Sequence, residues 1–301
     1  MSEKIKITFL GTAGAVPSAE RNHPAVLLNY KDENILFDCG EGTQRQFRKA
    51  GLNPCKITKL LISHWHGDHV LGIPGLLQTL AFSGYNKKLF IYGPRGTKKF
   101  MELLLRTFVF LGKIKIEIQE IENGKFVDTP DFYLESGKVS HGILCNAYSF
   151  VEKTKLRIDK KKLEKVKLPP GPILKKLKEG KNIIYEGKKY LARDLTVKGE
   201  GKKISVVMDT SINKNIISFV KNSDLLICEA TFSQELNKKA EEYKHLTSKQ
   251  AAEIAKKSKS KKLFLTHLSQ RHDRNQKKIL EESKKIFNNS FLARDLETIE
   301  I

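Results

Sequence analysis

The segment Lys59–His69 reads KLLISHWHGDH. Its apolar beginning is typical of a buried strand, and it ends in three histidines and one aspartate. His64 and His66 stand two residues apart, so on an extended strand end both imidazoles can point the same way. Zinc prefers imidazole and carboxylate ligands, and manganese and iron accept similar ones. The segment therefore predicts a metal site, in preference to a solvated polar loop after a strand.

Composition places the chain among ordinary globular proteins. Its 301 residues, 40% of them apolar, are enough for one large or two small domains with a substantial core. The four cysteines are scattered, which argues against a disulfide scaffold or a thiolate zinc finger, so we expect reduced core residues.

The charge is strongly basic. Fifty-five lysines and arginines against 34 acidic residues give +21, and a polyanion such as nucleic acid is the simplest partner for such a surplus. The alternative is a lysine-rich proteome that raises the charge of every protein.

The first residues do not look like a targeting signal. Met1 to Lys4 lead straight into the strand-like Ile5–Leu10, without the apolar block of a signal peptide, and no apolar run in the sequence could span a bilayer. We therefore expect a cytoplasmic protein without a membrane partner.

Apolar segments and amphipathic segments alternate, which indicates the α/β class. Strands are expected first at Lys4–Gly11, Ala25–Tyr30 and Asn34–Asp38, as an antiparallel start of a sheet, and later at Lys88–Gly93, Lys113–Glu122, Phe132–Ser140, Lys203–Met208, Asp224–Cys228 and Lys262–Leu265. Helices are expected at Ile73–Phe82, Thr97–Phe108, Thr247–Ser258 and Asn275–Phe287. Strand-like residues close the chain at Ser290–Ile301.

The arrangement seen at Lys59–His69, an apolar strand followed by a metal-binding side chain, recurs along the chain. Predicted strands end just before a metal-binding type of side chain at His141, Asp209, Glu229 and His267. Open α/β sheets place their sites at the carboxyl ends of strands. We therefore expect these side chains to gather. Asp38, at the end of the third strand, could cap the following helix or orient a ligand histidine.

Residues 152–182 break the α/β pattern. They contain twelve Lys or Arg against four Asp or Glu, and Pro169-Pro170-Gly171-Pro172 separates two short helical pieces. The segment could be a solvated linker or an ordinary charged helix pair. Because it interrupts a regular chain, we prefer a protruding insertion that grips a phosphate backbone.

Taken together, His64-x-His66-x-Asp68-His69, His141, Asp209 and His267 resemble the ligand set of the metallo-β-lactamase superfamily, whose fold is a four-layer αβ/βα sandwich with a di-metal site. FDCGEGTQ at 37–44, CEATF at 228–232 and HLT at 245–247 are similar to ribonuclease Z, the tRNA 3′-processing endonuclease family. This resemblance implies a single domain over 1–301, with a tRNA-binding exosite arm inserted at about 152–182.

The resemblance also implies roles for individual residues. Two zinc ions per subunit would be held, the first by His64, His66, His141 and Asp209, and the second by Asp68, His69, Asp209 and His267. Asp68 would accept a proton from the attacking water, and His245, oriented by Glu229, would protonate the leaving 3′ oxygen. Asp38 would support a ligand histidine. The implied substrate contacts are Arg21, Asn22, Gly171 and Pro172.

The family activity so implied is zinc-dependent removal of the 3′ trailer from precursor tRNA, leaving a 3′-hydroxyl on the tRNA and a 5′-phosphate on the trailer, by a homodimer. Two positions depart from the family pattern: Ala19 stands where the loop before Arg21 usually has lysine, and Cys228 stands where the CEAT loop usually begins with histidine. Two alternatives stay open, namely a hydrolase of small phosphodiesters or esters on the same fold, and a non-catalytic RNA-binding protein stabilised by metal.

Overall fold

The computed structural model describes residues 4–109 and 114–301. By their internal contacts these described residues form two compact units: a main unit within the ranges 1–127, 134–150 and 203–301, and a small unit of residues 128–133 and 151–202. No helix in these two described ranges combines the length and the apolar character that crossing a membrane requires.

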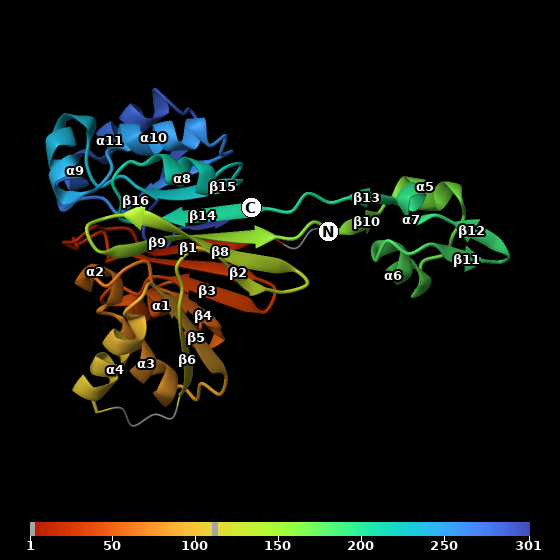
Figure 1. Ribbon diagram of the computed structural model, residues 1–301, viewed down its shortest axis with the longest axis horizontal. Helices are drawn as coiled ribbons and strands as arrows, with labels where there is room; N and C mark the ends of the chain where they lie inside the picture. The colour runs from red at the N-terminus through yellow and green to blue at the C-terminus, as the bar shows by residue number, and fades with distance from the viewer. Residues whose placement is uncertain (1–3, 110–113) are drawn as a thin grey trace. The chain divides into compact units, whose positions relative to one another are not determined.

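Two mixed sheets form the centre of the main unit (Figure 1). In the first, the strand order is β18-β1-β2-β3-β4-β5-β6, with antiparallel pairs from β18 to β3 and parallel pairs from β3 to β6. Its strands are β1 (Lys6–Gly11), β2 (Ala25–Tyr30), β3 (Glu33–Phe37), β4 (Lys59–Leu61), β5 (Lys88–Gly93), β6 (Lys115–Glu120) and β18 (Thr298–Glu300).

The second sheet has the order β17-β16-β15-β14-β9-β8-β7, and β14 to β17 are parallel. Its strands are β7 (Gly124–Asp128), β8 (Phe132–Ser140), β9 (Leu144–Glu152), β14 (Lys203–Val207), β15 (Leu225–Glu229), β16 (Leu263–Thr266) and β17 (Ser290–Leu292). Because β14, β15 and β16 run in parallel, residues that follow them meet at one edge of the sheet.

Helices cover the outer face of each sheet, which gives the helix-sheet-sheet-helix layering of Figure 1. The first sheet is covered by α1 (Thr43–Lys49), α3 (Ile73–Phe82) and α4 (Thr97–Thr107), and the second by α8 (Lys214–Phe219), α10 (Ser248–Lys257) and α11 (Gln276–Lys284). Between elements lie α2 (Gly67–Val70), α9 (Asn237–Tyr243) and the 3-10 turns η1 (Pro54–Lys56), η2 (Gln234–Leu236) and η3 (Gln270–Asn275).

The alternation of side chains along β1 explains the two cores. Leu10 packs into the apolar cluster under α1 and α3, whereas Phe9 points to the other face and stacks on Phe264 of β16, with ring centroids 5.4 Å apart. Tyr30 and Phe150 make a second contact of this kind at 5.2 Å. Aromatic pairs therefore hold the two sheets face to face.

The small unit has a core of its own, formed by Leu168, Leu177, Ile183, Ala192 and Leu195. Its elements are β10 (Leu156–Ile158) paired with β13 (Thr196–Lys198), the hairpin of β11 (Ile183–Tyr185) and β12 (Lys188–Tyr190), and the helices α5 (Lys160–Lys165), α6 (Ile173–Lys178) and α7 (Ala192–Leu195). Residues 152–182 are thus only part of a folded unit that continues to Lys202.

The predicted strands and helices of the main unit are confirmed, with shifts of a few residues at their ends. Lys113, predicted as the first residue of a strand, lies outside the described residues. Sequence patterns did not reveal β9, α8 or α9. They also missed α2, β7 and the short strands of the small unit, which have three to five residues each, too few to display a hydrophobic period.

Candidate active site

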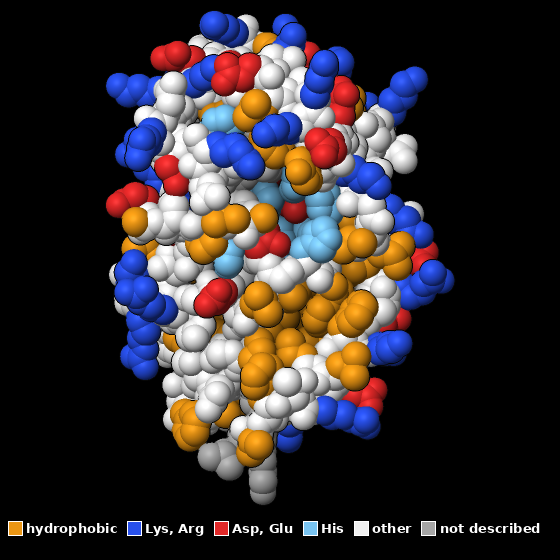
Figure 2. Space-filling model, turned by 90° about the vertical axis from the view of Figure 1, so that its left-hand side faces the viewer, with side chains coloured by type: hydrophobic (Ala, Val, Ile, Leu, Met, Phe, Trp, Pro, Cys, Tyr) orange, Lys and Arg blue, Asp and Glu red, His pale blue; other side chains and the backbone are white. Residues whose placement is uncertain are grey.

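The predicted metal-binding residues come from element ends that meet at one place. His64 and His66 follow β4, Asp68 and His69 lie on the single turn of α2, and His141 follows β8. Asp209 and His267 follow β14 and β16, both paired in parallel with β15, which carries Glu229. Figure 2 shows the histidines grouped in a depression of the surface together with acidic side chains.

The seven predicted ligand residues form two groups that share Asp209. In the first, His64, His66 and His141 face Asp209 Oδ2, with His141 Nε2 at 3.3 Å and His64 Nε2 at 3.6 Å from it. In the second, Asp68, His69 and His267 face Oδ1, with His267 Nε2 at 3.1 Å and His69 Nε2 at 3.5 Å from it.

The donor set fits two divalent metal ions. Within each group the candidate ligand atoms lie within 4.8 Å of one another. Asp209 Oδ1 is buried and has no hydrogen-bond partner among the described residues. A buried carboxylate oxygen without a partner costs free energy, and a cation between it and the imidazoles removes that cost. Such His and Asp groups are typical of a dinuclear metallo-β-lactamase site.

Burial and ion pairing oppose each other here. Burial disfavours ionised Asp68, yet hydrogen bonds with His267 and His69 outweigh it and lower the Asp68 pKa. Burial likewise disfavours the charged form of His69, but Asp209 and Asp38 raise its pKa well above the ordinary value. His64 is buried beside other imidazoles, and both effects lower its pKa. Burial also opposes ionisation of Asp209, but His267 and His69 hold its pKa well below the ordinary value. Asp68 and Asp209 therefore stay ionised, as carboxylate metal ligands must be.

Asp38 supports the site from behind. Its carboxylate is fully buried and accepts hydrogen bonds from Ser63 N at 2.6 Å, Ser63 Oγ at 2.8 Å and His69 Nδ1 at 2.7 Å. The other possibility, a cap on the next helix, does not occur, because Gly42 occupies the N-cap of α1 without a side-chain hydrogen bond. Asp38 thus leaves His69 Nε2 directed at Asp209 and Asp68.

His245 and Glu229 form a second functional pair beside the ligands. His245 Nδ1 lies 3.1 Å from Glu229 Oε1, and its Nε2 lies 3.9 Å from Asp209 Oδ2. Burial alone would lower the His245 pKa, but Glu229 and Asp209 raise it to about 9. His245 lies two residues before the N-cap of α10, Thr247, which makes a capping box with Gln250.

Thr231 connects these groups and was not predicted from the sequence. Its hydroxyl lies 2.6 Å from Glu229 Oε2, 2.9 Å from His267 Nδ1 and 3.3 Å from His245 Nδ1. Its position within CEATF was the available signal.

The residues predicted to contact tRNA lie in two places. In the main unit, the guanidinium of Arg21 is buried and donates to Thr12 Oγ1, Ala293 O and Gln276 Oε1. Asn22 donates from Nδ2 to Glu41 O. These described contacts are internal, so substrate binding by the pair stays a prediction.

The remaining residues singled out in the sequence are distributed as follows. Gly171 and Pro172 are exposed in the small unit, just before α6. Of the two positions that depart from the ribonuclease Z sequence pattern, Ala19 is exposed, whereas Cys228 is a fully buried core residue of β15.

Comparison with known proteins agrees with this geometry. Ribonuclease Z of Methanothermobacter thermautotrophicus is 38% identical over 99% of this chain and 97% of its own length. Ribonuclease Z of Oceanobacillus iheyensis is 41% identical, over 99% of this chain and 100% of its own. This chain belongs to the ribonuclease Z family. Its family resemblance, first suggested by sequence motifs, is thereby confirmed.

Solved structures give the same result for the fold. The short form of human tRNase Z superimposes with a TM-score of 0.71 at 28% identity, covering 98% of both chains. The metallo-β-lactamase fold protein YhfI from Bacillus subtilis has a TM-score of 0.72 at 21% identity, covering 100% of both chains. A third comparison matches residues 5–111 to the family described as anti-Pycsar protein Apyc1. This member of the ribonuclease Z family therefore has the metallo-β-lactamase fold.

Proposed function

We propose that this chain is a metal-dependent endoribonuclease that removes the 3′ trailer from precursor tRNA. The observation that carries the proposal is full-length identity of 38–41% to ribonuclease Z chains, in a protein whose six other candidate ligands surround Asp209. The products are a tRNA with a 3′-hydroxyl and a trailer with a 5′-phosphate.

The metal of this proposal is zinc, two ions per subunit. The donor set of five imidazoles and two carboxylates suits zinc. When bound, two zinc ions supply a water nucleophile at neutral pH and neutralise charge that develops on the phosphodiester.

The protein side chains handle the protons. Asp68 takes a proton from the attacking water, since its carboxylate lies within the ligand group and is held ionised by His69 and His267. As the new P–O bond forms, the bond from phosphorus to the 3′ oxygen breaks. His245 gives its proton to that oxygen, because Glu229 and Thr231 keep Nδ1 engaged and leave Nε2 toward the site.

We assign tRNA binding to the small unit, as the basic exosite arm of one metallo-β-lactamase-type domain over 1–301. Residues 151–202 contain seventeen Lys or Arg and seven Asp or Glu, so they account for ten of the net +21 charges. The lysines of α5 are exposed, as are Gly171 and Pro172 in the turn before α6. A folded, strongly basic unit suits a phosphate backbone better than a linker does.

We also propose that two copies associate and that the enzyme acts in the cytoplasm. Figure 2 shows hydrophobic side chains gathered next to the histidine depression. Exposed large apolar residues in the α2–α4 region are Leu71, Phe82, Phe100, Leu103, Phe108 and Val109. Exposed apolar side chains that gather in one region are typical of protein–protein interaction sites. Sedimentation of the wild type and of Leu103→Glu tests the dimer: the variant should shift toward the monomer.

Incubation with a 3′-extended precursor tRNA, followed by mapping of both product ends, tests the activity. Cleavage next to the tRNA body with a 3′-hydroxyl and a 5′-phosphate supports it. Hydrolysis of small phosphodiesters or esters without precursor cleavage favours a different enzyme on this fold. Binding of tRNA without turnover in the zinc-loaded protein favours the RNA-binding alternative.

A further inference from the structure

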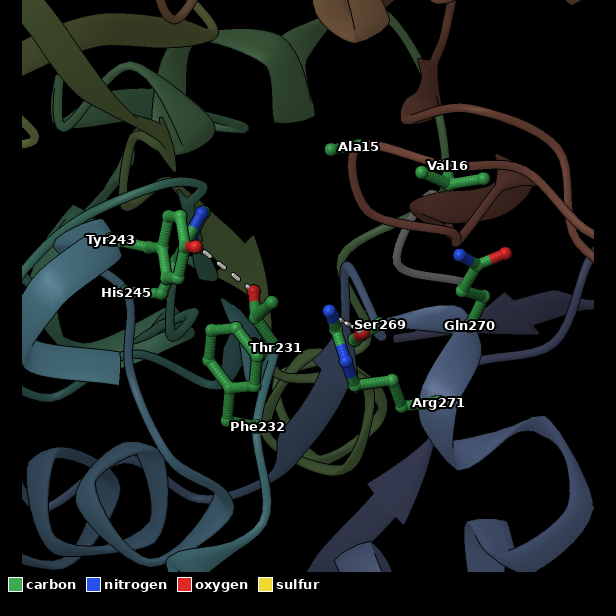
Figure 3. A pocket seen from close by; sticks show the side chains of 9 residues that line it. All are labelled: Ala15, Val16, Thr231, Phe232, Tyr243, His245, Ser269, Gln270 and Arg271. Carbon is green, nitrogen blue, oxygen red and sulfur yellow. Dashed lines mark hydrogen bonds between the residues drawn. The ribbon is translucent and has the colours of Figure 1, made fainter. Parts of the chain in front are cut away.

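A cavity of about 200 Å³ opens beside His245, outside the two ligand groups (Figure 3). One wall carries Phe232, Tyr243 and His245, and the opposite side carries Val16, with Ser269 and Arg271 between them. None of the metal-binding roles requires this space. It adjoins the reaction centre through His245, whose Nε2 lies 3.9 Å from Asp209 Oδ2, and through Thr231, whose hydroxyl lies 2.9 Å from His267 Nδ1.

The walls suit a flat aromatic ring. Phe232 is buried and forms the base of the aromatic wall, whereas Tyr243 is 57% exposed. Their ring centroids are 6.4 Å apart, and Phe232 meets His245 edge-on at 6.0 Å. Val16 is 48% exposed on the facing loop. An aromatic face opposite an apolar side chain is how proteins bind unpaired nucleobases of any sequence.

The polar groups suit the backbone of such a nucleotide. Arg271 is exposed, and the described structure gives its side chain one hydrogen bond, from Nη1 to Ser269 Oγ at 3.3 Å. The lining contains no carboxylate. A guanidinium at the rim can therefore bind a phosphate without a competing acidic group.

We propose that this cavity binds the base of the last nucleotide retained on the tRNA, with Tyr243 stacking on the base and Arg271 binding its 5′ phosphate. The inference rests on the function proposed above and adds a substrate subsite to it. The sugar of that nucleotide then presents its 3′ oxygen to His245.

The positions of Asp68 and His245 relative to the two oxygens of Asp209 indicate on which side of the cleaved bond the cavity lies. Asp68 belongs to the group that faces Oδ1, whereas His245 lies nearest Oδ2. In an in-line displacement the attacking water and the leaving oxygen occupy opposite sides of phosphorus. The cavity is lined by His245 and not by Asp68, so it lies on the side of the leaving 3′ oxygen.

The test is cleavage of precursor tRNA by the zinc-loaded enzyme and by Tyr243→Ala, Tyr243→Phe and, as an exposed aromatic outside the lining, Phe291→Ala. Three substrates are compared: unmodified, abasic at the last tRNA nucleotide, and abasic at the first trailer nucleotide. Losing one stacked base should lower kcat/KM about tenfold, so Tyr243→Ala should lose that factor on unmodified RNA, while Tyr243→Phe and Phe291→Ala keep wild-type rates.

The assignment requires that Tyr243→Ala causes no additional loss when the last tRNA base is already missing, and that bis(p-nitrophenyl) phosphate hydrolysis is unchanged. The assignment is wrong if Tyr243→Ala instead causes no additional loss on the RNA that lacks the first trailer base. It is also wrong if Tyr243→Ala cleaves unmodified RNA at the wild-type rate, or if it loses as much activity on the small substrate as on the RNA. If the wild type hydrolyses the small substrate but leaves precursor tRNA intact, the proposed function itself fails.

Discussion

Asp38 and His69 are joined by a buried hydrogen bond of 2.7 Å between Oδ2 and Nδ1, on the side of the imidazole away from Asp209. A carboxylate can only accept, so Nδ1 of His69 carries a proton, and Nε2 is the nitrogen that would offer its lone pair to a metal ion at the centre of the site. Support of this kind fixes the tautomer and orientation of a metal-binding histidine and makes it a better ligand.

We therefore predict that Asp38→Asn weakens zinc binding about 10- to 100-fold. Asn is a mild replacement because Asp38 has φ +56°, a conformation that Asn tolerates. Competition with a chromophoric chelator measures the affinity. The matched control is Asp32→Asn, an exposed aspartate near the same strand. Equal zinc affinity of both variants would contradict the role given to Asp38.

Asp68→Asn should reduce cleavage of precursor tRNA by about 100-fold or more, the usual contribution of a positioned proton acceptor. Its oxygen stays available for contacts with His267 and His69, but it no longer accepts a proton. Binding of precursor tRNA, measured by filter retention, should be unchanged, since other residues contact the phosphates. Turnover at the wild-type rate would remove Asp68 from the mechanism.

The sequence was most informative where a metal-binding side chain follows the end of a predicted strand. The structure brings together seven side chains that stood out in the sequence as metal-binding types after apolar strands, and that the family resemblance separated from Glu229 as ligands. Metal binding by these residues stays a prediction. The internal role of Arg21 was not predictable, since its partners Gln276 and Ala293 are 255 and 272 residues away in sequence. The core of the small unit was not predicted because Leu168, Leu177 and Ile183 are widely spaced among lysines.

A substrate with a good leaving group separates proton donation from the rest of catalysis. His245→Ala should lower cleavage of precursor tRNA about 100-fold or more, because the 3′ oxygen needs a proton as it leaves. Bis(p-nitrophenyl) phosphate, whose leaving phenolate needs none, should be hydrolysed at nearly the wild-type rate. Equal losses on both substrates would instead indicate that His245 supports the metal site.

Removing metal should destabilise the protein, because Asp209 Oδ1 is left buried without a hydrogen-bond partner. A ligand present at 100 times its dissociation constant stabilises the folded state by about 2.7 kcal/mol, which in a domain of this size raises Tm by about 5 °C or more. Calorimetry before and after chelation, with zinc added back, measures the effect. Magnesium at the same concentration serves as the control and should not restore Tm, because this site is rich in imidazole.

Charge removal in the small unit should change the salt dependence of tRNA binding. Lys160, Lys161 and Lys162 lie exposed at the start of α5, and replacing all three by Gln should weaken binding. The slope of log K against log salt should become shallower by about 0.7 to 0.9 for each phosphate group that the variant no longer neutralises.

The control variant replaces the exposed Lys256, Lys257 and Lys259 of the main unit, which removes the same charge. Identical slopes for both triple variants would mean that net charge, and not the small unit, binds the tRNA. A shallower slope in the α5 variant alone, with hydrolysis of bis(p-nitrophenyl) phosphate intact, places the phosphate contacts on the small unit.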